Sequence, residues 1–179
     1  ERLVYLKLRI SDGLGFSNKT LRRAPTTARR LVFVCFGNII RSPMCEALMQ
    51  RELDRLGRAE FTVASAGLNA TPGRLAHPWA VTAAHELGIP LEKHRARLLT
   101  RELIDQADAI FVMDYQNQVQ LISRLDGAKD KVFMLAAYAT PEYRSVEIPD
   151  PYYQDQERTR SCYHVINNCI HNLMRDLER

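Results

Sequence analysis

An apolar strand that ends in a cysteine constrains the fold of this chain more than any other feature. Residues 31–34 are apolar, and Cys35 follows them directly. Five residues separate this cysteine from Arg41, and the next two positions are Ser42 and Pro43, a proline that suits the first turn of a helix. This order predicts a strand, a short loop and a helix N-terminus. The backbone N–H groups of such a loop, with a helix dipole behind them, are typical of a site for phosphate-like anions.

The residue types around this loop indicate the chemistry of a phosphatase. The field that attracts an oxyanion also favours the thiolate of Cys35, which could attack phosphorus and carry the phosphoryl group as phosphocysteine. Arg41 offers a planar fork of donors for two phosphate oxygens, and Ser42 can donate its hydroxyl hydrogen to the sulfur. The alternative is an ordinary buried cysteine that packs like a small hydrophobe. The strand-to-helix position of Cys35, with Ser-Pro after the arginine, favours the catalytic interpretation.

The main chain of the loop is expected to bind the phosphate. Gly37 has no side chain to obstruct a close approach and tolerates positive φ, and Asn38 can bridge backbone groups that hold a strained loop. The candidate substrate-binding residues of this region are Phe36, Gly37, Asn38, Ile39, Ile40 and Ser42.

Asp150 is the candidate general acid that protonates the departing oxygen. It lies between Pro149 and Pro151, which restrict the backbone and suit a carboxylate held at one place on a loop. A turn aspartate without a catalytic role is the alternative. Because the cysteine loop needs an acid partner, we predict that Asp150 acts as general acid and base.

These two motifs together resemble the low-molecular-weight protein-tyrosine phosphatases over about residues 30–179, and the segment 65–68 is similar to bacterial members. In that family the loop typically reads V-C-x-G-N-I-C-R-S-P and the acid lies in D-P-Y-Y. Met113-Asp114, at the end of another expected strand, also resembles a family landmark. The resemblance implies that Tyr152 and Tyr153 wall the cleft and stack on a phosphotyrosine ring. It further implies a hydrogen-bonded network around the loop made by Asn38, Ser42, Ser65 and His94.

Ile40 is a departure from the family pattern, which often has a second cysteine at this position. Such a cysteine can trap an oxidised nucleophile as a disulfide. We therefore hypothesise that peroxide moves Cys35 further up the oxidation ladder and that thiols restore little activity.

Alternating strands and helices predict the fold class. We expect an α/β protein of three layers, with a central four-stranded parallel sheet, helices on both faces and the phosphate loop after the first strand. Ligands of such sheets bind beyond the carboxyl ends of the strands, where Cys35 falls. The expected strands cover 31–35, 61–66, 109–113 and 131–135, and the expected helices cover 43–56, 78–87, a short stretch after Thr100, 115–125 and 157–177.

The positive charge of the chain is concentrated near its beginning. Residues 1–30 carry a net charge of +6, whereas the remainder carries −2. We expect a phosphatase domain over 30–179 and a basic extension or linker over 1–29, with a short strand within 3–10. No nucleic-acid motif accompanies the charge, so no nucleic-acid partner is expected. The sequence has no pattern of a signal peptide or membrane span, and a reactive thiol suits a reducing compartment, so we expect a cytoplasmic protein.

The cysteine spacing does not suggest a metal site, and no cofactor is expected. The four cysteines lie at positions 35, 45, 162 and 169, without paired Cys-x₂-Cys motifs. Cys45 is expected in the core, and Cys162 and Cys169 share one face of the last helix as packing residues.

Three other functions are compatible with parts of the pattern. An arsenate reductase of the same fold shares the cysteine loop but needs resolving cysteines, and there is none between Cys45 and Cys162. A silent phosphate-binding module would not need its nucleophile, arginine and acid. The basic extension could also belong to a larger partner-binding or membrane-associated protein. The expected partner is a phosphotyrosine protein, and the bacterial resemblance suggests a tyrosine autokinase.

Overall fold

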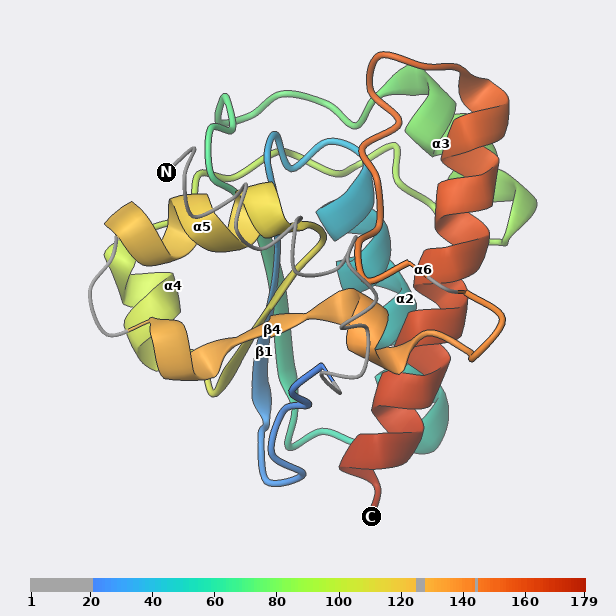
Figure 1. Ribbon diagram of the computed structural model, residues 1–179. Helices are drawn as coiled ribbons and strands as arrows, with labels where there is room; N and C mark the ends of the chain where they lie inside the picture. The colour runs from blue at the N-terminus through green and yellow to red at the C-terminus, as the bar shows by residue number, and fades with distance from the viewer. Residues whose placement is uncertain (1–20, 125–127, 144) are drawn as a thin grey trace.

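Parallel strands form a sheet at the centre of the protein (Figure 1). The sheet has four strands, and from one edge to the other they are the second, the first, the third and the fourth along the chain. The computed structural model describes residues 21–124, 128–143 and 145–179. The strands are β1 (Arg30–Cys35), β2 (Thr62–Gly67), β3 (Ala109–Val112) and β4 (Val132–Met134). The α-helices are α2 (Arg41–Leu56), α3 (Pro78–Glu86), α4 (Arg101–Gln106), α5 (Tyr115–Arg124) and α6 (Gln156–Leu177), and short 3-10 turns cover Lys129–Lys131 and Leu135–Tyr138.

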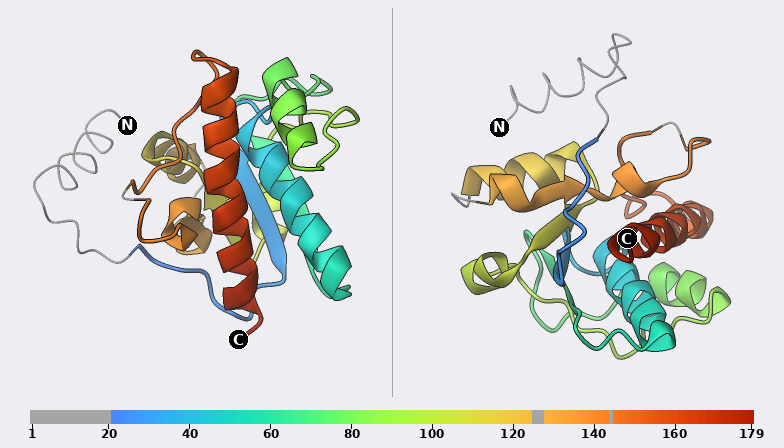
Figure 2. Two further views of the ribbon diagram at one scale, coloured as in Figure 1. Left: turned by 90° about the vertical axis from the view of Figure 1, so that its right-hand side faces the viewer. Right: turned by 90° about the horizontal axis from the view of Figure 1, so that it is seen from below.

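Two hydrophobic cores lie on the two faces of this sheet. Alternate residues of a strand point to opposite faces, so Leu31 and Phe33 of β1 join one core while Val32 and Val34 join the other. Helices α2, α3 and α6 cover the first face, and α4 and α5 cover the second (Figure 2). The predicted three-layer α/β fold with a four-stranded parallel sheet is therefore confirmed.

The ends of the elements follow local signals in the sequence. The side chain of Thr100 accepts a hydrogen bond from the N–H of Leu103 at 3.3 Å and caps α4, as expected. Helix α3 ends before Gly88, whose φ of 69° suits glycine. Every strand and helix expected in the described part of the chain is present, and its ends differ from the expected ones by at most two residues.

Residues 21–29 pack against the sheet and the helices. Arg22 donates to the carbonyl oxygens of Lys129 and Asp130, and its guanidinium lies 4.6 Å from the centre of the Phe133 ring. The N–H of Ala24 donates to the Tyr138 hydroxyl at 2.8 Å, and Ala28 is buried. The strand expected within 3–10 lies outside the described residues.

None of the helices in the described part of the chain combines the length and apolar character needed to span a membrane.

Candidate active site

The segment between β1 and α2 forms a loop whose carbonyl oxygens are held from outside. The N–H groups of Leu68 and Asn69 donate to the first two carbonyl oxygens, and His94 Nε2 bonds the carbonyl of Asn38 at 2.8 Å. The hydroxyl of Tyr163, on α6, donates to a further carbonyl at 3.0 Å. The carbonyl oxygens held in this way are those of Cys35, Phe36, Asn38, Ile39 and Ile40.

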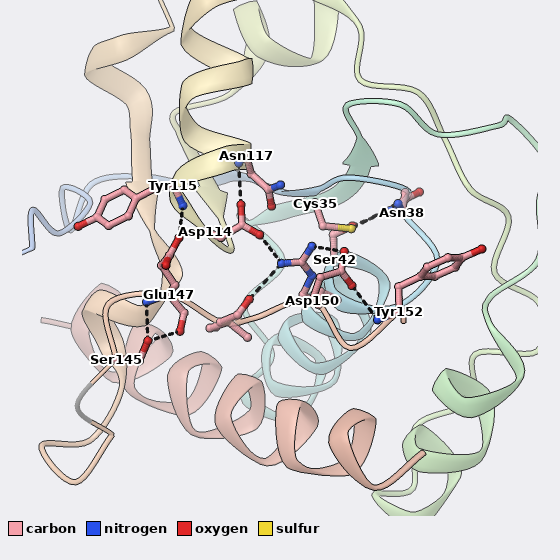
Figure 3. Close-up of polar contacts among 12 residues, drawn as sticks. Cys35, Asn38, Ser42, Asp114, Tyr115, Asn117, Ser145, Glu147, Asp150 and Tyr152 are labelled. Carbon is pink, nitrogen blue, oxygen red and sulfur yellow. Dashed lines mark hydrogen bonds and ion pairs between the residues drawn. The ribbon is translucent and has the colours of Figure 1, made fainter. Parts of the chain in front are cut away.

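This arrangement turns the N–H groups of the loop toward the cysteine. In a trans peptide the N–H and C=O groups point in opposite directions, so outward carbonyls leave the N–H groups pointing inward. The N–H of Asn38 donates to Cys35 Sγ at 3.3 Å (Figure 3). Ile40, at the N-cap of α2, makes no side-chain cap, which leaves the first N–H groups of the helix available. The loop can therefore bind an anion above the sulfur.

Gly37, which would tolerate a positive φ, does not adopt one, and the positive φ of the loop lies at Asn38, with a φ of 53°. Asparagine is tolerated there because its side chain makes compensating hydrogen bonds. Asn38 Nδ2 donates to the hydroxyls of Ser42 and Ser65 at 2.9 and 2.8 Å, and its Oδ1 accepts from the N–H of Arg97 at 2.8 Å. A β-carbon added at Gly37 would be in ordinary contact with Ile39 only.

A chain of hydrogen bonds runs from the sulfur to the surface, and its members in order are Ser42, the amide of Asn38, Ser65 and Glu46. The hydroxyl of Ser42 lies 3.0 Å from Cys35 Sγ. Ser65 donates to Glu46 at 2.5 Å, and Glu46 also pairs with Arg97 at 2.7 Å. Because the hydroxyl hydrogen of Ser65 is donated in a hydrogen bond to the carboxylate, its oxygen accepts from the Asn38 amide. Glu46 was not recognised in the sequence, where its only signal is its place on the first helix.

Arg41 lies at the base of the site and is 1% exposed. Its two terminal nitrogens pair with Asp114 and Asp150, each at 2.6 Å (Figure 3). Burial alone would lower the pKa of this guanidinium, but the two carboxylates and Cys35 raise it above its ordinary value. A buried charge of this kind is tolerated because it is paired.

The two carboxylates are themselves held by main-chain groups. Asp114 Oδ1 accepts from the N–H of Asn117 at 2.7 Å at the start of α5, and Asp150 Oδ1 accepts from the N–H of Tyr152 at 3.2 Å. The sequence singled out Asp150, but it gave Asp114 no role. The place of Asp114 just after a buried strand was the available signal.

A cleft of about 410 Å³ opens above the sulfur. Tyr152 is half-buried in its wall, Tyr153 is exposed at its mouth, and the two rings meet edge to face at 4.8 Å. Asn38, Ser42, Ser65 and His94 lie behind the loop and do not line the cleft. The sequence-predicted residues that do line it are Cys35, Phe36, Gly37, Ile39, Ile40, Arg41, Asp150, Tyr152 and Tyr153.

A family model described as low molecular weight phosphotyrosine protein phosphatase matches residues 30–179. The chain belongs to this family. It is therefore a hydrolase of the low-molecular-weight protein phosphatase type, and phosphoproteins are its implied substrates. The predicted family resemblance is confirmed.

Relatives within this phosphatase family differ in the substrate that their names give. A protein-arginine-phosphatase of Bacillus subtilis is 40% identical over 119 residues, which cover 66% of this chain and 78% of that protein. The low molecular weight protein-tyrosine-phosphatase Wzb of Escherichia coli is 34% identical over 136 residues, which cover 76% and 86%. The crystal structure of the Erwinia amylovora tyrosine phosphatase AmsI superposes with a TM-score of 0.77 at 28% identity and covers 89% of this chain and 99% of that one.

The other cysteines contribute to packing and not to the cleft. Cys45, Cys162 and Cys169 are buried, and burial raises the pKa of Cys162 and of Cys169 to about 12. Within the described ranges no group of three or more His, Cys, Asp and Glu side chains is arranged to hold a metal ion.

Proposed function

We propose that this phosphatase is a protein-tyrosine phosphatase that works through a phosphocysteine intermediate on Cys35. The observation that carries the proposal is the convergence of Cys35, Arg41 and Asp150 on one cleft with aromatic walls. We assign this activity to a domain over residues 30–179, with residues 1–29 as a basic extension.

In the first step the thiolate of Cys35 attacks phosphorus, and the bond between phosphorus and the tyrosyl oxygen breaks. The loop N–H groups and the Arg41 fork hold the phosphoryl oxygens through the transfer, where charge stabilisation supplies most of the catalysis. The hydroxyl of Ser42, 3.0 Å from the sulfur, stabilises the thiolate by donating to it.

Asp150 handles the protons of both steps. In this structure Asp150 is paired with Arg41. A bound phosphate competes for that guanidinium and places negative charge beside the carboxyl group, which favours its protonated form. The protonated carboxyl then gives its proton to the leaving tyrosyl oxygen. In the second step the carboxylate takes a proton from a water that attacks phosphorus, and the Cys35 thiolate leaves.

The walls of the cleft favour an aromatic phosphoester. Phe36, Ile39 and Tyr152 present apolar surface along it, and Tyr153 extends this surface at the mouth. Aromatic rings of this kind stack on a phosphotyrosine ring. Because Cys35 is only 3% exposed at the base of the cleft, the short side chain of phosphoserine would not bring phosphorus to the sulfur.

Phosphoarginine is the second candidate substrate, because one feature of the cleft favours it. Asn117 lines the cleft, and its Oδ1 is buried without a hydrogen-bond partner among the described residues. A phosphorylated guanidinium could donate to this oxygen if the Asn117 amide turned toward the cleft, whereas a phosphotyrosyl ester has no donor to offer. The two carboxylates of the cleft count against phosphoarginine, because both are already paired with Arg41 and neither is free to bind the guanidinium of the substrate.

The test is the hydrolysis of matched phosphotyrosine, phosphoarginine and phosphoserine peptides between about pH 5 and 8. We expect turnover of phosphotyrosine alone, lost in Cys35→Ser and retained in Cys169→Ala, a buried cysteine outside the cleft. Acid quenching during turnover that traps Cys35 carrying a phosphoryl group, without the peptide, would support the covalent intermediate. Turnover confined to phosphoarginine would instead establish the second candidate.

If phosphotyrosine proteins are substrates, the family resemblance suggests bacterial tyrosine autokinases as partners. Dephosphorylation of a purified autokinase tail, compared with an unrelated phosphotyrosine protein, measures that preference.

A further inference from the structure

An arginine that makes no ion pair with any described residue lies on the wall of the cleft. Arg74, in the loop between β2 and α3, lines the cleft together with Thr71 and Tyr152. Its guanidinium lies 5.9 Å from the centre of the Tyr152 ring, and NH2 donates to the tyrosine hydroxyl at 3.3 Å. These contacts place a positive charge beside the ring that we expect to face the substrate.

The position of this arginine is coupled to the phosphate loop. The N–H of Gly73 donates to the carbonyl of Ala96 at 2.9 Å, and the N–H of Ala96 donates to the carbonyl of Arg74 at 2.8 Å. The next residue, Arg97, donates its N–H to Asn38 Oδ1. Two backbone hydrogen bonds and one loop contact therefore hold the main chain of Arg74 at a defined place relative to the phosphate loop.

No carboxylate among the described residues neutralises the charge of Arg74. Some other arginines are paired with carboxylates, as Arg97 is with Glu46 at 2.7 Å and Arg160 is with Glu86 at 2.7 Å. Arg74 has no such ion pair within the described residues. The charge of Arg74 also acts on His77, because burial lowers the pKa of this histidine and the charge of Arg74 lowers it further. The guanidinium therefore retains donors and a charge that a ligand could satisfy.

We propose that Arg74 selects phosphotyrosine substrates that carry an aspartate or glutamate next to the phosphorylated residue. This inference rests on the proposed function, because it needs a phosphotyrosine seated in the loop. The peptide on either side of that residue must cross the rim of the cleft, where Arg74 stands. A guanidinium binds a carboxylate through two parallel hydrogen bonds, which a backbone carbonyl or an amide cannot match.

The test compares kcat/KM for three phosphotyrosine peptides that differ only in having Glu, Gln or Lys on both sides of the phosphorylated residue. For an ion pair at a solvent-exposed rim, we expect a preference of about three- to five-fold for Glu over Gln. This ratio should fall toward one in Arg74→Gln and in high salt, and Arg74→Glu should favour the Lys peptide.

Arg95→Gln is the matched control. Arg95 pairs in the backbone with the residue next to Arg74, bonds only main-chain carbonyls, and does not line the cleft. Its loss changes the net charge equally, so it should leave the Glu-to-Gln ratio unchanged.

Two outcomes would overturn the inference while leaving the proposed function intact. One is equal turnover of the three peptides by the wild type. The other is a fall in turnover of all three by the same factor in Arg74→Gln, since that would mean that the arginine only supports Tyr152. Failure of every phosphotyrosine peptide, with phosphoarginine hydrolysed, would refute the proposed function itself.

Discussion

Individual side chains far along the chain hold the phosphate loop in place. Tyr163 and His94 bond loop carbonyls 123 and 56 positions away in the sequence. Their hydrogen bonds turn the loop N–H groups toward the sulfur, which is the arrangement that an anion needs. His94 was predicted through the family resemblance, whereas Tyr163 reads as an ordinary buried residue of an amphipathic helix.

Ile40 should determine how the enzyme responds to oxidation. In Ile40→Cys, a thiol beside Cys35 could form a disulfide with its sulfenic acid and protect it from further oxidation. Cys162 offers no such protection, because burial raises its pKa to about 12 and little thiolate is present. We expect dithiothreitol to restore more activity to peroxide-treated Ile40→Cys than to the wild type.

Ile40→Ala serves as the control for this experiment, because it removes the same packing without adding a thiol. It should recover as poorly as the wild type. Full recovery of the wild type with dithiothreitol would contradict the hypothesis, and mass spectrometry of Cys35 would identify the oxidation state reached.

At the scale of elements, the end of β2 passes directly beneath the phosphate loop. A β-carbon added at Gly67 would lie 2.8 Å from the carbonyl oxygen of Phe36 and 2.9 Å from the nitrogen of Asn38. Both are backbone atoms, so they cannot move aside as a flexible side chain could. The loop and the strand therefore fit together only if residue 67 lacks a side chain.

Gly67→Ala should consequently damage the site as well as the fold. We expect a loss of stability of about 1–3 kcal/mol from overpacking. We also expect kcat/KM to fall at least about tenfold, because the displaced N–H of Asn38 also contacts Cys35 Sγ. Denaturant unfolding and phosphopeptide kinetics measure the two effects separately.

Gly57→Ala is the control that separates the loss of stability from the loss of activity. Gly57 caps the opposite end of α2 with a φ of 65°, and nothing lies within 4 Å of an added β-carbon. This variant should lose about 1 kcal/mol of stability through backbone strain and keep its kcat/KM. If Gly67→Ala had the same kcat/KM as the wild type, the prediction would be wrong, because the loop would have adjusted to the extra methyl group.

At the scale of the whole molecule, the carboxylate of Asp108, just before β3, binds the main chain at the start of β1. Asp108 Oδ2 accepts from the N–H groups of Arg29 and Arg30 at 3.0 and 2.9 Å, and Oδ1 pairs with the Arg30 guanidinium at 2.7 Å. The side-chain hydrogen bond from Arg30, followed by the two backbone donors, lowers the pKa of Asp108 to about 2.

This carboxylate should contribute to the dependence of stability on pH. Its pKa is lower in the folded state than the value near 4 of an unfolded chain, so the folded state binds the proton less. The stabilisation is therefore complete above about pH 4 and is lost as the pH falls through about 2. Asp108→Asn should be about 1 kcal/mol less stable at pH 7, with the difference disappearing near pH 2. A constant difference in urea unfolding across this range would contradict the assignment.

Much of this architecture could be predicted from local patterns. The apolar runs before Cys35 and Asp114 are long enough to identify buried parallel strands, and Thr100 and Gly88 are standard signals of helix ends. The positive φ at Asn38 had no signal in the sequence, because Gly37 is the permissive residue by type and the side-chain hydrogen bonds that let Asn38 adopt that conformation come from the packed structure.

The sequence by itself determined the strand, loop and helix that carry Cys35 and Arg41, because these residues are neighbours and their spacing is local. It also determined the family, through the motifs at 35–43 and 150–153. Only the tertiary structure decided that Asp114 and Asp150 share Arg41, that Gly67 must lack a side chain, and that Arg74 lines the cleft with no ion pair to another described residue. Those relations join segments brought together by the packing of the sheet and helices, and no local pattern records which distant residues meet.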